Sequence, residues 1–348
     1  MKLKLLYILV FLLLFSAACS KQQEVVNENV TNSKEENIEE TNEEEPIQIY
    51  DNMYPLTGLG TNNSVDTRAV AVMINNHPKA RPQSGLYSAD VVYELLAEGN
   101  VTRFLAIFQS EQPETIGPVR SARDYYIELS KGFNSLYVAH GWSPEAKRML
   151  EAGEVDSLNG LFFDGTLFWR STDRVAPHNS YISFENIEKG VEKKGYDLEQ
   201  RPQAYSFLTE DEITAITGDK GESVNIAYDS SSTWTVKYVY NKEKEKYERY
   251  SGDVQTADKE TATPVLIDNV FVVEMDHKII DRAGRREINV TSGGKGFLMQ
   301  KGVQREVEWQ NIDGRIIPFK NGEEVGFVPG KTWINIVPST NIVSFENY

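Results

Sequence analysis

The sequence has little cysteine and little histidine: one cysteine and four histidines among 348 residues. Because Cys19 is the only cysteine, no disulfide can form within the chain, and the fold has to rely on its core. A formal net charge of −16 argues against binding to nucleic acid or to anionic membrane surfaces. The longest apolar run, at the N-terminus, is too short for a comfortable membrane span.

What the sequence does contain is typical of a globular protein. Hydrophobic residues make up 40% of the chain and charged residues 25%, which is enough material for a sizeable core. The length predicts two domains with additional segments.

The N-terminus predicts export. Lys2 and Lys4 precede the apolar stretch "LLYILVFLLLFSAA", and small residues lead to Cys19. This resembles the lipobox of bacterial lipoproteins, in which the cysteine after the cleavage site carries the lipid. The alternative is an ordinary signal peptide whose end happens to include a cysteine. We therefore expect a signal peptide over 1–18, lipidation at Cys19, and an anchor in the bilayer on the extracytoplasmic face of the cell membrane.

Three further regions follow along the chain. Residues 19–51 are acidic and almost free of packing side chains, which predicts a disordered tether. Mixed strand and helix patterns over 52–195 predict an α/β or α+β domain. We expect this domain to bind a ligand, for the reasons given below. A polar join over 196–223 leads to closely spaced strand patterns over 224–348, which predict an all-β domain.

The candidate site lies in the first domain, where three of the four histidines stand beside proline or glycine. Arginine, asparagine and serine accompany them in "INNHPKARPQSG", "TRF", "GPVRSARD", "HG" and "FWRSTDRVAPHN". Guanidinium groups and imidazoles suit a phosphate or a carboxylate. The predicted ligand-binding residues are Asn76, His77, Arg103, Arg120, Ser121, Arg123, His140, Arg170, Arg174, His178 and Asn179.

Arg120 and Arg123 have the strongest individual argument. They are three residues apart, so on the first turn of the predicted helix they would share a face with free N–H groups. The competing interpretation is structural, because arginines near aspartates often form surface ion pairs and "PHN" is a good turn sequence.

Catalysis is left open. The catalytic candidates are Asp124 and Asp164, as carboxylates for a base or a hard metal, and His178, as a proton carrier. The sequence has no HExxH, no GxSxG and no histidine pair at ligand spacing, so we predict neither a metal site nor a cofactor.

Several long motifs resemble the YerB-like family of bacterial lipoproteins. They are "MINNHPKARPQSGL", "TRFLAIF", "GPVRSARDYY", "HGWSPEA", "APHN" and, near the end, "PGKTWINIVP". The resemblance runs from about residue 50 to the C-terminus and implies two domains and an envelope location. It implies no activity and no catalytic residue.

A second resemblance concerns layout alone. The hairpin, the Arg/Asp loop and the strand before a helix are similar to the LytR-CpsA-Psr glycopolymer transferases. Three functions therefore stand open: binding of an anionic envelope ligand, an enzyme of phosphoryl or glycosyl-phosphate chemistry, and a scaffold for other envelope proteins.

Overall fold

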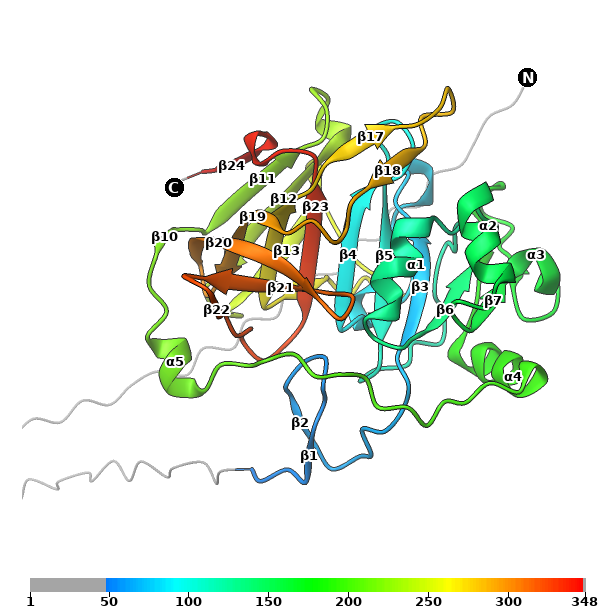
Figure 1. Ribbon diagram of the computed structural model, residues 1–348, viewed down its shortest axis with the longest axis horizontal. Coiled ribbons are helices and arrows are strands. Elements are labelled where there is room, and N and C mark those ends of the chain that lie inside the picture. Colours follow the sequence, from blue (N-terminus) through cyan, green and yellow to red (C-terminus); the bar gives the residue numbers. More distant parts are fainter. Residues whose placement is uncertain (1–47, 347–348) are drawn as a thin grey trace, which may run out of the picture. The chain divides into compact units, whose positions relative to one another are not determined.

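The fold is built around one long sheet (Figure 1). The computed structural model describes residues 48–346. The sheet has 12 strands in the order β22-β21-β20-β19-β16-β23-β4-β5-β3-β6-β7, and β10 pairs with β20. From the first half of the chain come β3 (Val70–Asn75), β4 (Val91–Leu96), β5 (Thr102–Phe108), β6 (Leu136–Ala139) and β7 (Ser157–Asn159). From the second half come β10 (Asp219–Lys220), β16 (Asn269–Glu274), β19 (Gly294–Gln300), β20 (Val303–Ile312), β21 (Arg315–Lys320), β22 (Glu323–Glu324) and β23 (Thr332–Val337).

Strand β23 joins the two halves of this sheet. It runs parallel to β16 on one side and parallel to β4 on the other, with Ile334 opposite both Phe271 and Tyr93. All six residues of β23 are buried. The two halves of the chain therefore share one hydrogen-bonded sheet.

A second sheet of six strands covers part of one face of the first. Its order is β14-β13-β12-β11-β24, with β15 paired to β13. Its strands alternate buried and more exposed residues, as a sheet with one covered face should. They are β11 (Ser223–Ala227), β12 (Thr235–Asn241), β13 (Lys246–Ser251), β14 (Val254–Gln255), β15 (Leu266–Ile267) and β24 (Val343–Phe345).

The helices begin at recognisable caps. The Ser143 and Ser183 side chains accept hydrogen bonds from backbone N–H groups, and Thr209 and Glu212 form a capping box. The α-helices are α1 (Asp124–Lys131), α2 (Pro144–Glu151), α3 (Gly160–Phe163), α4 (Phe184–Lys194) and α5 (Glu210–Thr214). The 3₁₀ helices are η1 (Pro78–Ala80), η2 (Leu86–Ser88), η3 (Ser232–Trp234) and η4 (Thr340–Ile342).

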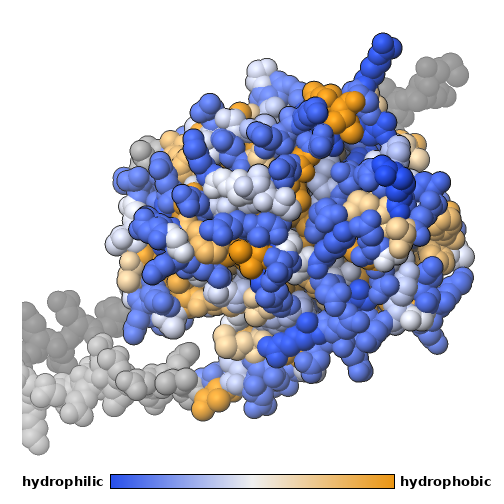
Figure 2. Space-filling view, viewed as in Figure 1, coloured by the Kyte–Doolittle hydropathy of each residue, from blue (hydrophilic) through white to orange (hydrophobic). Residues whose placement is uncertain are grey.

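Three small strand pairs complete the described chain. They are β1 (Asn52–Met53) with β2 (Gly60–Thr61), β8 (Trp169–Arg170) with β9 (Ser180–Tyr181), and β17 (His277–Ile279) with β18 (Arg286–Ile288). In Figure 2, hydrophilic residues predominate on the visible face. Hydrophobic side chains are mostly internal, although Ile279 of β17 is 60% exposed.

Two hydrophobic cores lie on opposite faces of the long sheet. Val91, Tyr93 and Leu95 of β4 pack on the face that α1 and α2 cover. Val92 packs on the other face, together with side chains of α4 and of the second sheet. Alternation along each strand thus supplies both cores.

The predicted fold class is confirmed: a mixed sheet with helices is followed by a region of mostly antiparallel strands. The stretch "NVFVVEMDHKII" forms two strands, β16 and β17, rather than one. The join is packed rather than free, because the buried Tyr205 ring contacts both Phe133 and Phe327.

Candidate functional site

The candidate site lies at one edge of the long sheet. Strands β3, β6 and β7 are parallel neighbours, and β4 runs in the same direction because it and β3 are both antiparallel to β5. Asn75 ends β3, His140 follows β6, and Asn159 ends β7. Ligand sites of α/β sheets lie outside these carboxyl ends, where loops converge.

Two histidines stack on each other beyond β3. The ring centroids of His77 and His178 are 4.6 Å apart, and the planes make an angle of 26°. Asn75 fixes both: its Oδ1 accepts from the His77 backbone N–H at 3.0 Å, so its Nδ2 donates to His178 Nδ1 at 2.9 Å. The residues of "APHN" therefore meet those of "INNHP", which are about a hundred positions earlier in the chain.

The partners of these two rings also fix their tautomers. His178 Nδ1 accepts from an amide, and His77 Nδ1 accepts from the Lys79 backbone N–H at 3.1 Å. In each neutral ring the proton is then on Nε2. Within residues 48–346 neither Nε2 atom has a hydrogen-bond partner. Both Nε2 atoms reach solvent.

Arg120 lies close enough to this pair for its charge to act on both imidazoles. Its backbone N–H donates to Met73 at 2.8 Å, and its carbonyl accepts from His140 at 2.9 Å, so the segment is held between the ends of β3 and β6. In the described part of the chain its guanidinium forms neither an ion pair nor a hydrogen bond, and its nitrogen atoms reach solvent. We call Asn75, His77, Arg120 and His178 the histidine–arginine site.

Burial and nearby cations keep the histidines neutral. Partial burial lowers the pKa of His77 and of His178, and the Arg120 guanidinium lowers both further. The His140 pKa is lowered by burial and by the cations of Arg170 and Arg120, against a smaller opposite effect of Asp164. Near neutral pH the site thus offers imidazole N–H donors and one positive charge.

The predicted helical turn of Arg120 and Arg123 is wrong. Helix α1 begins at Asp124, and its N-cap, Arg123, has an extended backbone with φ −132° and ψ 151°. The segment before it is tied to the sheet, which prevents the helix from starting earlier. Consequently the two guanidiniums do not share a helical face.

Arg123 and Arg103 form a separate cluster around Glu98. Arg103 donates to Glu98 at 2.6 Å and to the Ser121 carbonyl at 2.8 Å, and Arg123 donates to the other oxygen of Glu98. Burial alone would raise the pKa of Glu98, but the two arginines lower it overall. Both arginines already have a carboxylate partner.

His140 and Arg170 extend the site on its other side. Arg170 donates to His140 Nε2 at 2.8 Å and to Asn179 Oδ1 at 3.2 Å, and it forms an ion pair with Asp164 at 2.9 Å. His140 Nδ1 then donates to the Ser180 hydroxyl at 2.7 Å. This chain of contacts connects β6, β8 and β9.

The other predicted residues have structural contacts. Arg174 donates to the carbonyls of Ala80 and Pro82 and to Tyr181, while Ser121 donates to the His140 carbonyl. Asn76 is buried and donates to Thr102 and Glu94. Of the catalytic candidates, only His178 belongs to the histidine–arginine site.

Asp124 and Asp164 lie elsewhere. Asp124, whose pKa burial raises, lines a cavity of about 530 Å³ between α1, α2 and the β17–β18 pair. Asp164 is held by Arg170. Across the described residues no group of three or more His, Cys, Asp or Glu side chains has an arrangement that could hold a metal.

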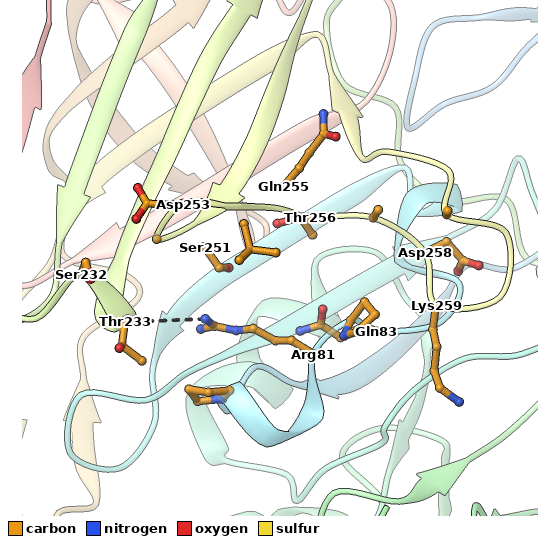
Figure 3. Close-up of a pocket in the computed structure, with 16 residues that line it drawn as sticks. Arg81, Gln83, Ser232, Thr233, Ser251, Asp253, Gln255, Thr256, Asp258 and Lys259 are labelled. Atoms are coloured by element: carbon orange, nitrogen blue, oxygen red, sulfur yellow. Dashed lines mark hydrogen bonds between the residues drawn. The ribbon is translucent and has the colours of Figure 1, made fainter. Parts of the chain in front are cut away.

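Sequence reasoning missed three groups around the site. Asn75 was not among the predicted site residues, although it orients both imidazoles. Arg81 lines a cavity of about 660 Å³ next to η1 (Figure 3). Arg249 of β13 forms a fully buried ion pair with Glu94 of β4 at 2.9 Å. The available signal for Asn75 was a polar residue directly after a buried strand. The pairing of Arg249 with Glu94 left no signal in the sequence, because it joins distant segments of the chain.

Cys19, the signal peptide and most of the predicted tether lie outside the described residues. Within residues 48–346, no helix combines the length and the apolar character that crossing a bilayer requires.

With the edge site and the two-part sheet established, comparison with known proteins gives the family. Residues 56–197 match the N-terminal domain, and residues 224–334 the C-terminal domain, of a protein of unknown function named DUF3048. The chain belongs to this two-domain, YerB-like family.

One relative is "Putative lipoprotein YerB" of Bacillus subtilis (strain 168). It is 53% identical over 296 residues, which are 84% of this chain and 88% of that protein. The crystal structure of YerB protein from Bacillus subtilis has a TM-score of 0.80 and 51% identity, and the match covers 85% of this chain and 100% of that one.

Proposed function

We propose that the protein binds an anionic ligand, a phosphate or carboxylate group, at the histidine–arginine site. The observation that supports this most directly is Arg120, a half-buried guanidinium with no carboxylate partner among the described residues, in a chain with net charge −16. The Nε2–H groups of His77 and His178 add two donors beside it. Converging donors around one cation are what an anion requires.

The same geometry favours binding over catalysis. A general base at His178 would need a free lone pair on Nε2, but Asn75 donates to Nδ1 and keeps the proton on Nε2. Glu98, the carboxylate whose pKa Arg120 influences, is already bound by two arginines. Asp164 is bound by Arg170.

The test is anion binding by the compact unit that begins at Gln48. Isothermal titration with inorganic phosphate should show binding to the wild-type protein. Arg120→Ala should weaken it tenfold to a hundredfold, since one charge-assisted hydrogen bond contributes about 1.5–3 kcal/mol. The unfolding free energy should change by less than about 0.5 kcal/mol, because the Arg120 guanidinium forms no hydrogen bond or ion pair with the residues that the structure describes.

Arg148→Ala is the matched control, because the Arg148 side chain is 73% exposed on α2, outside the site. It should bind phosphate as the wild type does. Equal affinity of the wild type and Arg120→Ala would contradict the proposal, and so would a large loss of stability in Arg120→Ala.

We also propose that the protein is anchored to the extracytoplasmic face of the cell membrane through a lipid on Cys19. The lipobox-like sequence and the name of the relative support this location. Cys19→Ala should move the exported protein from the membrane fraction to the soluble one, because the anchoring thiol is gone. Undiminished membrane retention after normal export would rule the anchor out.

A further inference from the structure

A cavity adjoins the histidine–arginine site. It has a volume of about 660 Å³, within the range of small-molecule sites, and lies between the segment after β3 and the loops of the second sheet (Figure 3). Pro78, the residue after His77, lines it, and so does Thr233. The ring of Trp234, next to Thr233, is 6.4 Å from that of His77. The wall of the cavity is therefore continuous with the site.

Arg81 connects the cavity to the histidine–arginine site. Its Nε donates to Asn76 Oδ1 at 3.0 Å, and one terminal nitrogen reaches the Thr233 carbonyl at 3.5 Å across the cavity (Figure 3). It forms no ion pair with a carboxylate of the described chain. Its charge lowers the pKa of His77, as does that of Arg120. His77 thus lies near two guanidiniums, neither of which forms an ion pair with a carboxylate among residues 48–346.

The other lining groups indicate what the cavity accepts. The hydroxyls of Ser232 and Thr233 and the carboxylate of Asp253 make no side-chain hydrogen bond with other described residues. An acyl chain would cover these polar groups without giving them partners. The Asp253 carboxylate disfavours a second anion, and the one lysine of the lining, Lys259, is already paired with Asp173 at 2.9 Å. Most of the lining surface is apolar, with Pro82 and Val254 among the residues that provide it, and this surface suits the C–H face of a sugar ring. Hydroxyl groups, which both donate and accept, suit the polar part of the lining.

We infer that this cavity binds the uncharged, hydroxyl-bearing body of the ligand whose anionic group lies on the histidine–arginine site. The ligand class is a sugar or polyol that carries a phosphate or carboxylate. The anion lies near His77, between Arg81 and Arg120, and the hydroxyl-bearing part extends toward Thr233 and Asp253. This inference rests on the proposed anion site and adds the identity of the rest of the ligand.

The experiment compares three probes on the unit that begins at Gln48: inorganic phosphate, glucose 1-phosphate and glucose. The wild type should bind glucose 1-phosphate at least tenfold more tightly than phosphate, because the sugar occupies the cavity. Thr233→Trp, which fills the cavity, and Asp253→Ala, which removes an acceptor, should each abolish that advantage and leave phosphate affinity unchanged. Glu188→Ala, an exposed carboxylate on α4, is the control and should keep it.

The outcomes separate this inference from the proposed function. If phosphate binds but glucose 1-phosphate binds no more tightly, the cavity is not a sugar subsite and the anion site stands. If no probe binds, both are wrong. If glucose binds as tightly as glucose 1-phosphate, the two sites are not linked and the inference fails. Asp253→Ala keeps the test valid if Thr233→Trp does not fold, because Asp253 is exposed.

Discussion

Glu94 and Arg249 form the most deeply buried charge pair of the described chain. Both side chains are fully shielded from solvent, and two of their N–O distances are 2.9 Å. Thr102 and the Trp333 indole also donate to Glu94, and Arg249 donates to Thr256 in the wall of the 660 Å³ cavity. The pair joins β4 to β13 and supports one wall of that cavity.

Removing one member of this pair should be costly. Arg249→Leu leaves the Glu94 carboxylate buried without its cation, which should lower the unfolding free energy by about 3–5 kcal/mol. The double variant Glu94→Leu/Arg249→Leu should lose less than the sum of the two single variants, because neither charge is then left alone. Urea denaturation measures all three.

The matched control is Lys278→Leu, which breaks an exposed ion pair of 3.7 Å between β17 and β18. Its effect should stay within about 0.5 kcal/mol. Strictly additive losses in the Glu94 and Arg249 series would show that the two charges do not depend on each other.

For single residues, the sequence indicated which side chains gather at the site better than it indicated which side chains contact each other. It singled out His77, Arg120 and His178, which the structure does bring together. It could not tell that Arg103 and Arg123 bind Glu98 while Arg120 does not, because Glu98 reaches them only through the turn between β4 and β5. Which arginine stays free is decided by tertiary packing.

At the scale of elements, the local sequence is sufficient to predict a helix start or a turn where contacts between neighbouring residues determine it. The cap at Ser143 and the β4–β5 hairpin at Gly99-Asn100 both follow from residues that are adjacent in the sequence. The start of α1 was missed because residues 119–122 make backbone hydrogen bonds to strands and loops distant in the sequence. At this point tertiary hydrogen bonds override the helix propensity of the residues.

Strand β23 also shows where prediction from the local sequence ends. Its sequence "TWINIV" has the aromatic and β-branched residues typical of a strand, and all six residues are buried. Its position between β16 and β4 was not predictable, because a parallel pairing leaves no turn signal in the sequence. The union of the two halves in one sheet depends on that single position.

At the scale of the whole molecule, charge is unevenly distributed. The chain has a net charge of −16, yet Arg81 and Arg120 lie at the sheet edge without an ion pair to any carboxylate of the described part of the chain. An acidic protein repels anions at long range, and salt screens that repulsion beyond about 10 Å. Binding of an anion here therefore depends on short-range donors, which only the folded arrangement of distant loops supplies.

The continuous sheet also determines how the protein should unfold. Chains of this length often unfold domain by domain, and the two matched domains are separated by a join. Here, however, β23 pairs with both halves, Tyr205 packs between them, and the Glu94–Arg249 pair crosses from one to the other. We expect a single cooperative transition in urea, with amides of β3 and β20 exchanging hydrogen at the same free energy of opening. A chain that ends at Gly330, before β23, should lose protection in both strands, whereas one that ends at Pro338, after β23, should retain most of it. Unequal opening free energies for β3 and β20 in the wild type would mean that the halves are independent domains that merely share an edge.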